Sequence, residues 1–174
     1  ESGAFNTNEV KRALEGCVKQ SQHAGHRLHE LVDFLQKGEI VTEKLNLNEV
    51  VMDALRIARN DGYSDFHQVL QLEPNLPAVL ANRLHIQKTL VNLVRNAVES
   101  MRTANVSLSA ITITVKTLKE KNLAMVSIVD TGPGIDQEIV RFIFDPFFTT
   151  KPTGIGMGLS ISRALIEANG GQLW

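Results

Sequence analysis

The stretch "AITITVKTLKEKNLAMVSIVD", residues 110–130, decides the fold class. Its two halves, 110–118 and 123–130, carry β-branched and other apolar residues in the alternating order that is typical of strands. The charged turn KEKN, residues 119–122, separates them and is too short for a crossover connection. The two strands therefore form an antiparallel hairpin, which excludes a purely parallel sheet.

Upstream of the hairpin, the sequence predicts a strand between two helices. Asn48 is the expected cap of a helix that runs to about Asn60, and residues 66–72 alternate like a strand. Asn82 can cap a second helix, which carries apolar residues at helical spacing to about Met101.

Downstream of the hairpin, a short helix is expected near 136–141, and a longer one from the glycine-rich stretch to about Asn169. Residues 170–174 resemble the start of a strand. Because helices and strands interleave around a hairpin, we predict an α/β two-layer sandwich, with a mixed, mostly antiparallel sheet covered by helices on one face.

A different pattern occupies the N-terminal part. Apolar or small residues between Val10 and Leu35 recur in steps of four and three, which predicts a long helix that packs against a partner helix. Ser21 and Ala24 weaken this seam in its middle, and Gly38 is a plausible end of the helix.

Composition excludes several classes of protein. The 174 residues have a net charge of -1 and contain no basic run, which argues against a nucleic-acid partner. The single Cys17 cannot form an internal disulfide and fits a reducing compartment. Without an apolar run of membrane-spanning length or a signal peptide, this part is expected to be cytoplasmic, whether or not the parent protein is membrane-anchored.

The segment "TKPTGIGMGLSIS", residues 150–162, places three glycines at alternate positions directly before a helix. Backbone amides at a helix start can bind an anion. The segment lacks the Walker pattern, and Leu159 stands where the dinucleotide fingerprint needs its third glycine. Taken alone, it is either an anion site or a helix entry that needs flexible backbone.

The order of four motifs separates these alternatives. "NLVRNAVES" (92–100), "DTGPGI" (130–135), "FDPFFTTK" (144–151) and "GIGMGLSIS" (154–162) resemble the N, G1, F and G2 boxes of sensor histidine kinases. The resemblance covers roughly residues 45–174 and is strongest to the nitrogen- and oxygen-sensing branch. It implies the catalytic ATP-binding fold that histidine kinases share with gyrase, mismatch-repair ATPases and heat-shock chaperones.

The resemblance implies ATP and Mg²⁺ as ligands. Asn96 is the implied metal ligand, and Asp130 the implied acceptor for the adenine amine, partly buried at a strand end. The glycines and Lys151 would hold the phosphates, with Glu99 standing where many relatives carry a basic residue. The full set of expected ATP-binding residues is Asn92, Asn96, Asp130, Gly132, Gly134, Ile135, Phe148, Thr149, Thr150, Lys151, Gly154, Gly156, Met157, Gly158 and Leu159.

The Phe-rich motif is expected to anchor a mobile lid, residues 145–157, that orders around the γ-phosphate. Phe144 and Phe147 are predicted to be core residues, since phenylalanine is buried by default.

The implied activity is phosphoryl transfer to a histidine. Hydrolysing branches of the superfamily carry a glutamate at the position of Asn92, whose amide cannot take a proton from water. The phosphoryl would pass to a histidine on a dimerisation hairpin, and then to the aspartate of a response-regulator receiver domain. A regulatory pseudokinase module and, less favoured, an ATP hydrolase are the alternatives.

The acceptor histidine is expected to lie outside this chain, which leaves it without a catalytic residue of its own. Of His23, His26 and His29, only His29 precedes an acid, and no proline follows it as the family pattern requires. Residues 1–42 would be the second helix of the hairpin, and 43–174 the catalytic domain, truncated before its last strand. The parent would be a homodimeric phosphoprotein, and this chain monomeric or weakly dimeric.

Overall fold

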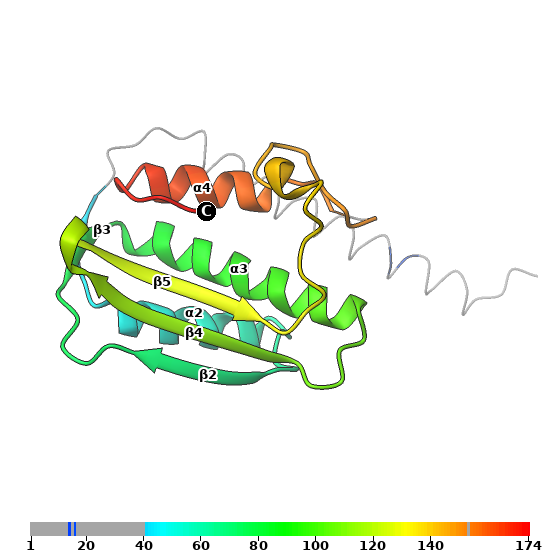
Figure 1. Ribbon diagram of the computed structural model, residues 1–174, viewed down its shortest axis with the longest axis horizontal. Coiled ribbons are helices and arrows are strands. Elements are labelled where there is room, and N and C mark those ends of the chain that lie inside the picture. Colours follow the sequence, from blue (N-terminus) through cyan, green and yellow to red (C-terminus); the bar gives the residue numbers. More distant parts are fainter. Residues whose placement is uncertain (1–13, 15, 17–40, 153) are drawn as a thin grey trace, which may run out of the picture. The chain divides into compact units, whose positions relative to one another are not determined.

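The computed structural model describes residues 14, 16, 41–152 and 154–174. The predicted heptad helix lies outside the described residues, apart from Leu14 and Gly16, which are helical. The described elements follow one another from blue to red in Figure 1: β1 (Glu43–Leu45), α2 (Leu47–Asn60), β2 (His67–Leu72), β3 (Val79–Ala81), α3 (Arg83–Thr103), β4 (Ala110–Leu118), β5 (Leu123–Asp130) and α4 (Gly158–Glu167).

The main sheet has three strands in the order β2-β4-β5. Strands β4 and β5 pair antiparallel from Ile111 opposite Asp130 to Leu118 opposite Leu123, which confirms the predicted hairpin. Strand β2 pairs parallel to β4, and β1 pairs antiparallel to β3 in a separate two-stranded sheet. The strand pairing is therefore mixed and mostly antiparallel, as predicted.

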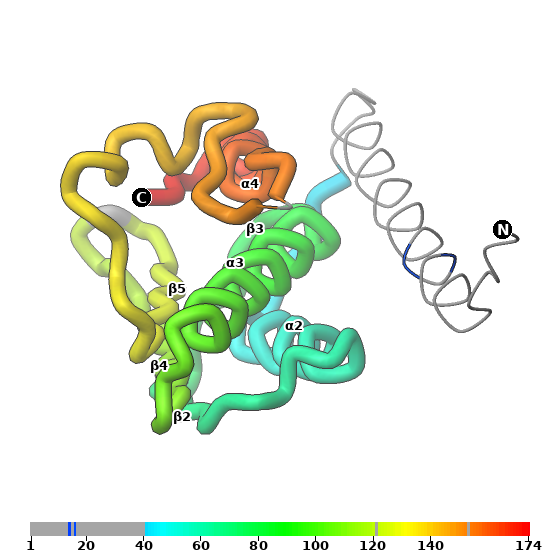
Figure 2. The backbone as a smooth tube through the Cα atoms, turned by 90° about the vertical axis from the view of Figure 1, so that its right-hand side faces the viewer, coloured from blue at the N-terminus to red at the C-terminus, as the bar shows by residue number. Residues whose placement is uncertain are grey.

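The helices cover one face of this sheet. Alternate residues of β4 point toward the helices, and Ile111, Ile113 and Val115 are almost fully buried there. Figure 2 shows α2 and α3 on the same side of the sheet, with α4 beside α3. The core between the two layers also includes Val50, Val51, Ala54, Val94, Val98 and Met101.

The helix starts show one correct prediction and one error. Asn82 caps α3, since its Oδ1 accepts a hydrogen bond from the amide of His85 at 3.0 Å. The cap of α2 is Asn46, not Asn48: Asn46 has extended backbone, and its Oδ1 accepts from the Asn48 amide at 3.1 Å. The helix starts earlier because Leu47 is buried in the core, and the Asn48 side chain instead donates to the carbonyl of Glu73.

Two other predicted elements differ from the structure. Near 136–141 only a 3-10 helix forms, Val140–Phe142, because residues 136–138, 140 and 141 are exposed and offer no apolar face for packing. Residues 170–174 are not a strand. Their glycines end α4 instead, as the amides of Gly170 and Gly171 donate to carbonyls of its last turn, and no described strand pairs with the residues that follow.

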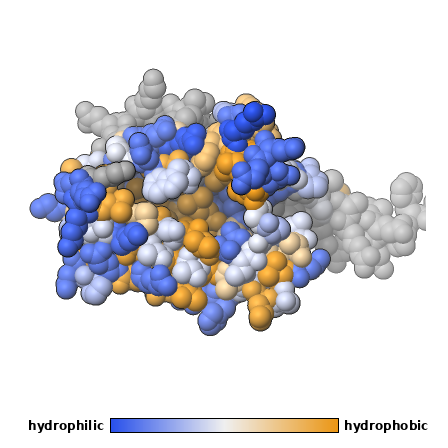
Figure 3. Space-filling model, viewed as in Figure 1, coloured by the Kyte–Doolittle hydropathy of each residue, from blue (hydrophilic) through white to orange (hydrophobic). Residues whose placement is uncertain are grey.

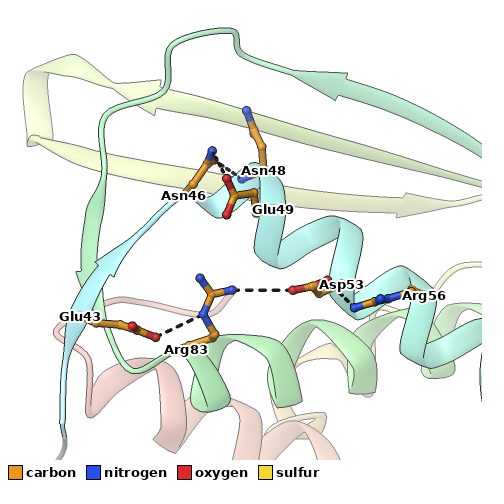
Figure 4. Close-up of polar contacts among 7 residues, drawn as sticks. All are labelled: Glu43, Asn46, Asn48, Glu49, Asp53, Arg56 and Arg83. Atoms are coloured by element: carbon orange, nitrogen blue, oxygen red, sulfur yellow. Dashed lines mark hydrogen bonds and ion pairs between the residues drawn. The ribbon is translucent and has the colours of Figure 1, made fainter.

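Ion pairs fix the start of α3 to its neighbours. The Arg83 guanidinium lies 3.2 Å from Glu43 on β1 and 3.7 Å from Asp53 on α2, and Asp53 also pairs with Arg56 at 2.8 Å (Figure 4). Since these side chains are half-exposed, each pair contributes little stability, about 0–1 kcal/mol. Their main effect is to orient α3, which carries the candidate site.

The start of α3 is also tied to the end of α4. Asn169 Oδ1 accepts from the amide of Asn82 at 2.6 Å, and Asn169 Nδ2 lies 3.1 Å from His85 Nδ1. Burial, together with the charge of Lys88, lowers the pKa of His85 below its usual value. Within the described residues, no helix is long and apolar enough to cross a bilayer.

Candidate functional site

Helix α3 presents the N box to the rest of the site. Asn92, Asn96 and Glu99 are four and three residues apart, so they share one face of the helix. All three are half-buried, while Val94 and Val98 of the same segment lie in the core. The core residues thus fix which way the polar face points.

Asn92 joins the N box to the G2 box. Its Nδ2 donates to the hydroxyl of the buried Ser162 on α4 at 3.0 Å. A Cβ added to Gly158, the first residue of α4, would lie 2.8 Å from Asn92 Oδ1. Helix α4 therefore starts in direct contact with α3, and a larger residue at position 158 would require the Asn92 side chain to shift.

Lys151 joins the F box to the N box. Its Nζ donates to Asn96 Oδ1 at 2.9 Å and to Glu99 Oε2 at 2.5 Å. The other oxygen of Glu99 accepts from the Tyr63 hydroxyl at 2.9 Å. The predicted phosphate-binding lysine therefore contacts the predicted metal ligand.

Glu99 is ionised in this arrangement. Burial by itself raises the pKa of its carboxyl, but the hydrogen bond and charge of Lys151 outweigh that effect, with help from the Tyr63 hydroxyl and the charge of Arg95. The net result is a pKa below the usual glutamate value.

Asp130 occupies the end of β5. It is the cross-strand partner of Ile111, so its side chain lies on the sheet face that is covered by the helices. Its Oδ1 accepts from the Gly132 amide at 2.8 Å. Contrary to the expectation of partial burial, Asp130 is exposed, because β5 has a neighbouring strand on one side only in the described sheet.

The two phenylalanines of the F box that were predicted to be core residues both lie outside the main core. Phe147 is not a core residue: it is 71% exposed, and its backbone is left-handed with φ of 69°. Phe144 is half-buried under the guanidinium of Arg163, 3.6 Å from the ring centroid, and Phe148 packs against Phe142. These rings anchor the F box locally rather than in the main core.

The F and G2 boxes pack backbone to backbone. Gly156 has φ of 74°, and a Cβ added there would lie 2.4 Å from the carbonyl carbon of Phe147. Nearby, the Lys151 amide donates to Thr149 Oγ1 at 3.1 Å, and the Gly154 amide donates to the Lys151 carbonyl at 3.1 Å. The lid is thus folded on itself directly before α4.

The start of α4 has the features of an anion site. Its N-cap residue, Met157, makes no side-chain capping hydrogen bond. Amides in the first turn of a helix have no partner within the helix, so those of Gly158 and Leu159 can donate to phosphate oxygens. The predicted residues Gly134, Ile135 and Thr150 lie exposed in the segment between β5 and α4. On the face drawn in Figure 3, apolar surface lies between β5 and this segment.

The residues at the site fit the ligands that the motifs imply. Asn96 Oδ1 already accepts a hydrogen bond from a cation, the Lys151 ammonium, and a neutral amide oxygen is a ligand that Mg²⁺ accepts. The start of α4 also lies against the Asn92 side chain, beside the same face of α3.

Sequence reasoning missed two partners of the site. Ser162 lies four residues after Gly158, so helical spacing could have placed it near Asn92. Tyr63 is 36 residues from Glu99, and no local pattern signals their contact.

Comparison with known proteins identifies the family. Residues 81–174, more than half of the chain, match the family described as histidine kinase-, DNA gyrase B- and HSP90-like ATPase. The chain belongs to this family. Among its relatives are sensor protein FixL of Bradyrhizobium diazoefficiens, 36% identical over 97% of this chain and 33% of FixL, and the C4-dicarboxylate transport sensor protein DctS of Rhodobacter capsulatus, 33% identical over 97% of this chain and 25% of DctS. The chain therefore spans a third or less of these two sensor proteins.

Solved structures of this family confirm the α/β fold. The catalytic domain of histidine kinase ThkA is 32% identical, with a TM-score of 0.65 over 78% of this chain and 86% of that domain. ThkA in complex with the response regulator protein TrrA has a TM-score of 0.73 over all of this chain and 48% of ThkA, at 23% identity. Full-length ShkA in complex with AMPPNP also has a TM-score of 0.73, over 92% of this chain and 34% of ShkA, at 19% identity.

Proposed function

We propose that this chain is the ATP-binding catalytic part of a two-component sensor histidine kinase. In this proposal residues 43–174 bind Mg-ATP, and the γ-phosphoryl passes to a histidine on a dimerisation hairpin supplied by another molecule. Residues 1–42 would be the second helix of such a hairpin. The phosphoryl is then relayed to an aspartate of a response regulator.

The observation that carries this proposal is the contact of the F and G2 boxes with the N box. Lys151 lies on Asn96, and the start of α4 lies against Asn92, so residues far apart in the sequence meet on one face of α3. A lysine, a neutral amide oxygen and the open start of a helix are together a set of groups that suits a metal-bound polyphosphate.

Each part of the site has a role in this proposal. Asp130, which can only accept hydrogen bonds when ionised, binds the exocyclic amine of adenine and disfavours a guanine carbonyl. The amides of Gly158 and Leu159 and the Lys151 ammonium hold the phosphates. When bound at Asn96, Mg²⁺ supplies the positive charge that phosphoryl transfer requires. The remaining predicted residues of the lid complete the phosphate contacts.

Transfer is favoured over hydrolysis by Asn92. Its amide has no proton-accepting group for a water molecule, and its nitrogen is engaged by Ser162. The protein therefore positions the donor phosphoryl, and the acceptor histidine supplies the nucleophile.

The partners in this proposal follow from the reaction. They are ATP, a histidine-containing hairpin of the same or a sister protein, and the receiver domain of a response regulator, since ThkA forms a complex with the response regulator protein TrrA. Because ATP is a cytoplasmic metabolite, this part of the parent protein would act in the cytoplasm, as a homodimer through the hairpin. No nucleic-acid partner is proposed.

Phosphoryl transfer in trans tests the proposal. The chain is mixed with a separately made hairpin from a related kinase, γ-labelled ATP and Mg²⁺, and the acid-labile, base-stable label on the hairpin is measured. We expect label with the unchanged chain and a loss of more than tenfold in initial rate with Asn96→Ala. The matched control is Asn60→Ala at the end of α2, which should keep the full rate. ATP binding without transfer would favour the regulatory pseudokinase, and steady release of free phosphate would favour the hydrolase.

A further inference from the structure

Asn96 Oδ1 has two competing uses. In the structure it accepts from Lys151 Nζ at 2.9 Å, whereas the proposed function assigns it to Mg²⁺. A metal ion at its usual distance of about 2.1 Å from that oxygen would lie within about 5 Å of the ammonium. Two cations so close repel each other, so one oxygen cannot serve both well.

Glu99 is the second hydrogen-bond acceptor of the Lys151 ammonium. It stands three residues after Asn96 on the same face of α3 and binds the ammonium through Oε2. The two contacts hold Lys151 between a carboxylate and an amide oxygen, although its sequence position is more than fifty residues away from either.

Tyr63 holds Glu99 in turn. Its hydroxyl donates to Oε1 at 2.9 Å, so both oxygens of the carboxylate are engaged. The Tyr63 ring lies under the guanidinium groups of Arg95 and Arg102, whose carbons are 5.0 and 5.4 Å from its centroid. The carboxylate is therefore held through its second oxygen by a residue other than Lys151.

We propose that Glu99 is a positioning residue that keeps Lys151 on Asn96 in the nucleotide-free protein, so that a magnesium-bound nucleotide must displace the lysine before Asn96 can reach the metal. The positioning of Lys151 by Glu99 stands on the observed contacts alone, and only the displacement of Lys151 by a magnesium-bound nucleotide rests on the proposed function. Once it has left both Asn96 and Glu99, Lys151 can turn toward the phosphates. Metal binding at α3 is thereby coupled to rearrangement of the lid.

A simple surface ion pair is the alternative. The side chains of Lys151 and Glu99 are 42% and 32% exposed, and pairs of that kind often contribute little. The chain offers a matched control in Asp65, which pairs with Arg102 of the same helix at 2.7 Å and accepts its hydrogen bonds from Arg102 and Ser64, not from Lys151. Asp65→Asn therefore removes a similar charge without touching Lys151.

The first experiment uses the nucleotide-free chain. Amide hydrogen exchange is compared in peptides from residues 145–152 of the unchanged protein, Glu99→Gln, Tyr63→Phe and Asp65→Asn. We expect the exchange rate to be three- to tenfold higher in Glu99→Gln than in the unchanged protein. The rate should increase by a smaller factor in Tyr63→Phe and should not change in Asp65→Asn. Equal exchange in all four proteins would overturn the positioning role of Glu99.

The second experiment measures the magnesium dependence of nucleotide binding. A fluorescent ADP analogue is titrated at fixed concentrations of Mg²⁺ and in EDTA. We expect Glu99→Gln to need three- to tenfold less Mg²⁺ for half-maximal binding, with affinities in EDTA within twofold of the unchanged protein. An unchanged or higher magnesium requirement in Glu99→Gln would overturn the competition of Lys151 and Mg²⁺ for Asn96 Oδ1.

If the unchanged chain bound no nucleotide, the proposed function would fail, and with it the competition for Asn96. The exchange comparison would still decide whether Glu99 holds Lys151.

Discussion

The substitution Gly156→Ala should separate lid geometry from overall folding. Gly156 has φ of 74°, and its added Cβ would lie 2.4 Å from the carbonyl carbon of Phe147 and 2.5 Å from the carbonyl oxygen of Phe148. Gly134 is the matched control, since its φ is 79° but no atom lies within 4 Å of its added Cβ. The two substitutions therefore share the conformational cost and differ in the collision.

The expected effects can be worked from these contacts. Alanine in the left-handed region costs about 1–2 kcal/mol at either position. At Gly156 the obstructing atoms are backbone, so no side-chain rotation relieves them. Because carbon atoms prefer separations of about 3.5–4.0 Å, the F and G2 boxes must move apart by about 1 Å. A displacement of that size in a positioned site costs on the order of 100-fold.

Calorimetric titration with a non-hydrolysable ATP analogue and Mg²⁺ provides the assay. We expect Gly156→Ala to weaken binding about 100-fold, which is about 2.7 kcal/mol, and Gly134→Ala to weaken it by less than tenfold. Neither glycine belongs to the main core, so both variants should unfold within a few degrees of the unchanged protein.

Equal affinities for the two alanine variants would refute this reasoning, because the contact at Gly156 would then have no bearing on the nucleotide. A large loss of thermal stability in Gly156→Ala alone would also refute it, since the lid would then contribute to the core.

Three further predictions concern the frame around the site. Asn92→Ala leaves the buried Ser162 hydroxyl without its partner, so the free energy of unfolding in urea should fall by about 1–3 kcal/mol, whereas an equal loss in Asn60→Ala would point to a general helix effect. Because the pKa of His85 is lowered in the folded protein, the unfolded chain takes up a proton there first as the pH falls, so stability should be steady above about pH 6.5 and decrease below it. Urea midpoints measured between pH 5.5 and 7.5 should depend less on pH in His85→Gln than in the unchanged protein, and an identical pH dependence would exclude His85 as the cause. Incubated alone with γ-labelled ATP and Mg²⁺, the chain should acquire no base-stable label, and stoichiometric label on its own histidines would show that it carries an acceptor.

Local patterns predicted the parts of the fold that depend on near neighbours. The β4–β5 hairpin follows from period-two alternation on either side of a short turn, and the start of α3 from the capping ability of Asn82. The cap of α2 was misplaced because Asn46 and Asn48 are equally good caps, and burial of Leu47 decides between them.

The parts that failed depend on contacts between distant residues. Phe147 was predicted to be buried, but it is exposed. Its left-handed backbone packs against Gly156, and no local sequence pattern encodes that contact. The expected role of Lys151 as a phosphate ligand stays a prediction, and the structure adds that Glu99 accepts a hydrogen bond from Lys151 and another from Tyr63. Motif order therefore located the candidate site, while the contacts within it required the folded chain.

Discrimination between ATP and GTP tests the central claim most directly. Both nucleotides are titrated with Mg²⁺ into the unchanged chain, Asp130→Asn and the control Asp136→Asn, whose carboxylate lies in the same exposed segment and caps a turn. If Asp130 binds the adenine amine, the unchanged chain and Asp136→Asn should bind ATP at least tenfold more tightly than GTP, and Asp130→Asn should lose most of its ATP affinity while remaining folded. Equal affinity for ATP and GTP, or unchanged ATP affinity in folded Asp130→Asn, would contradict the adenine site at the end of β5.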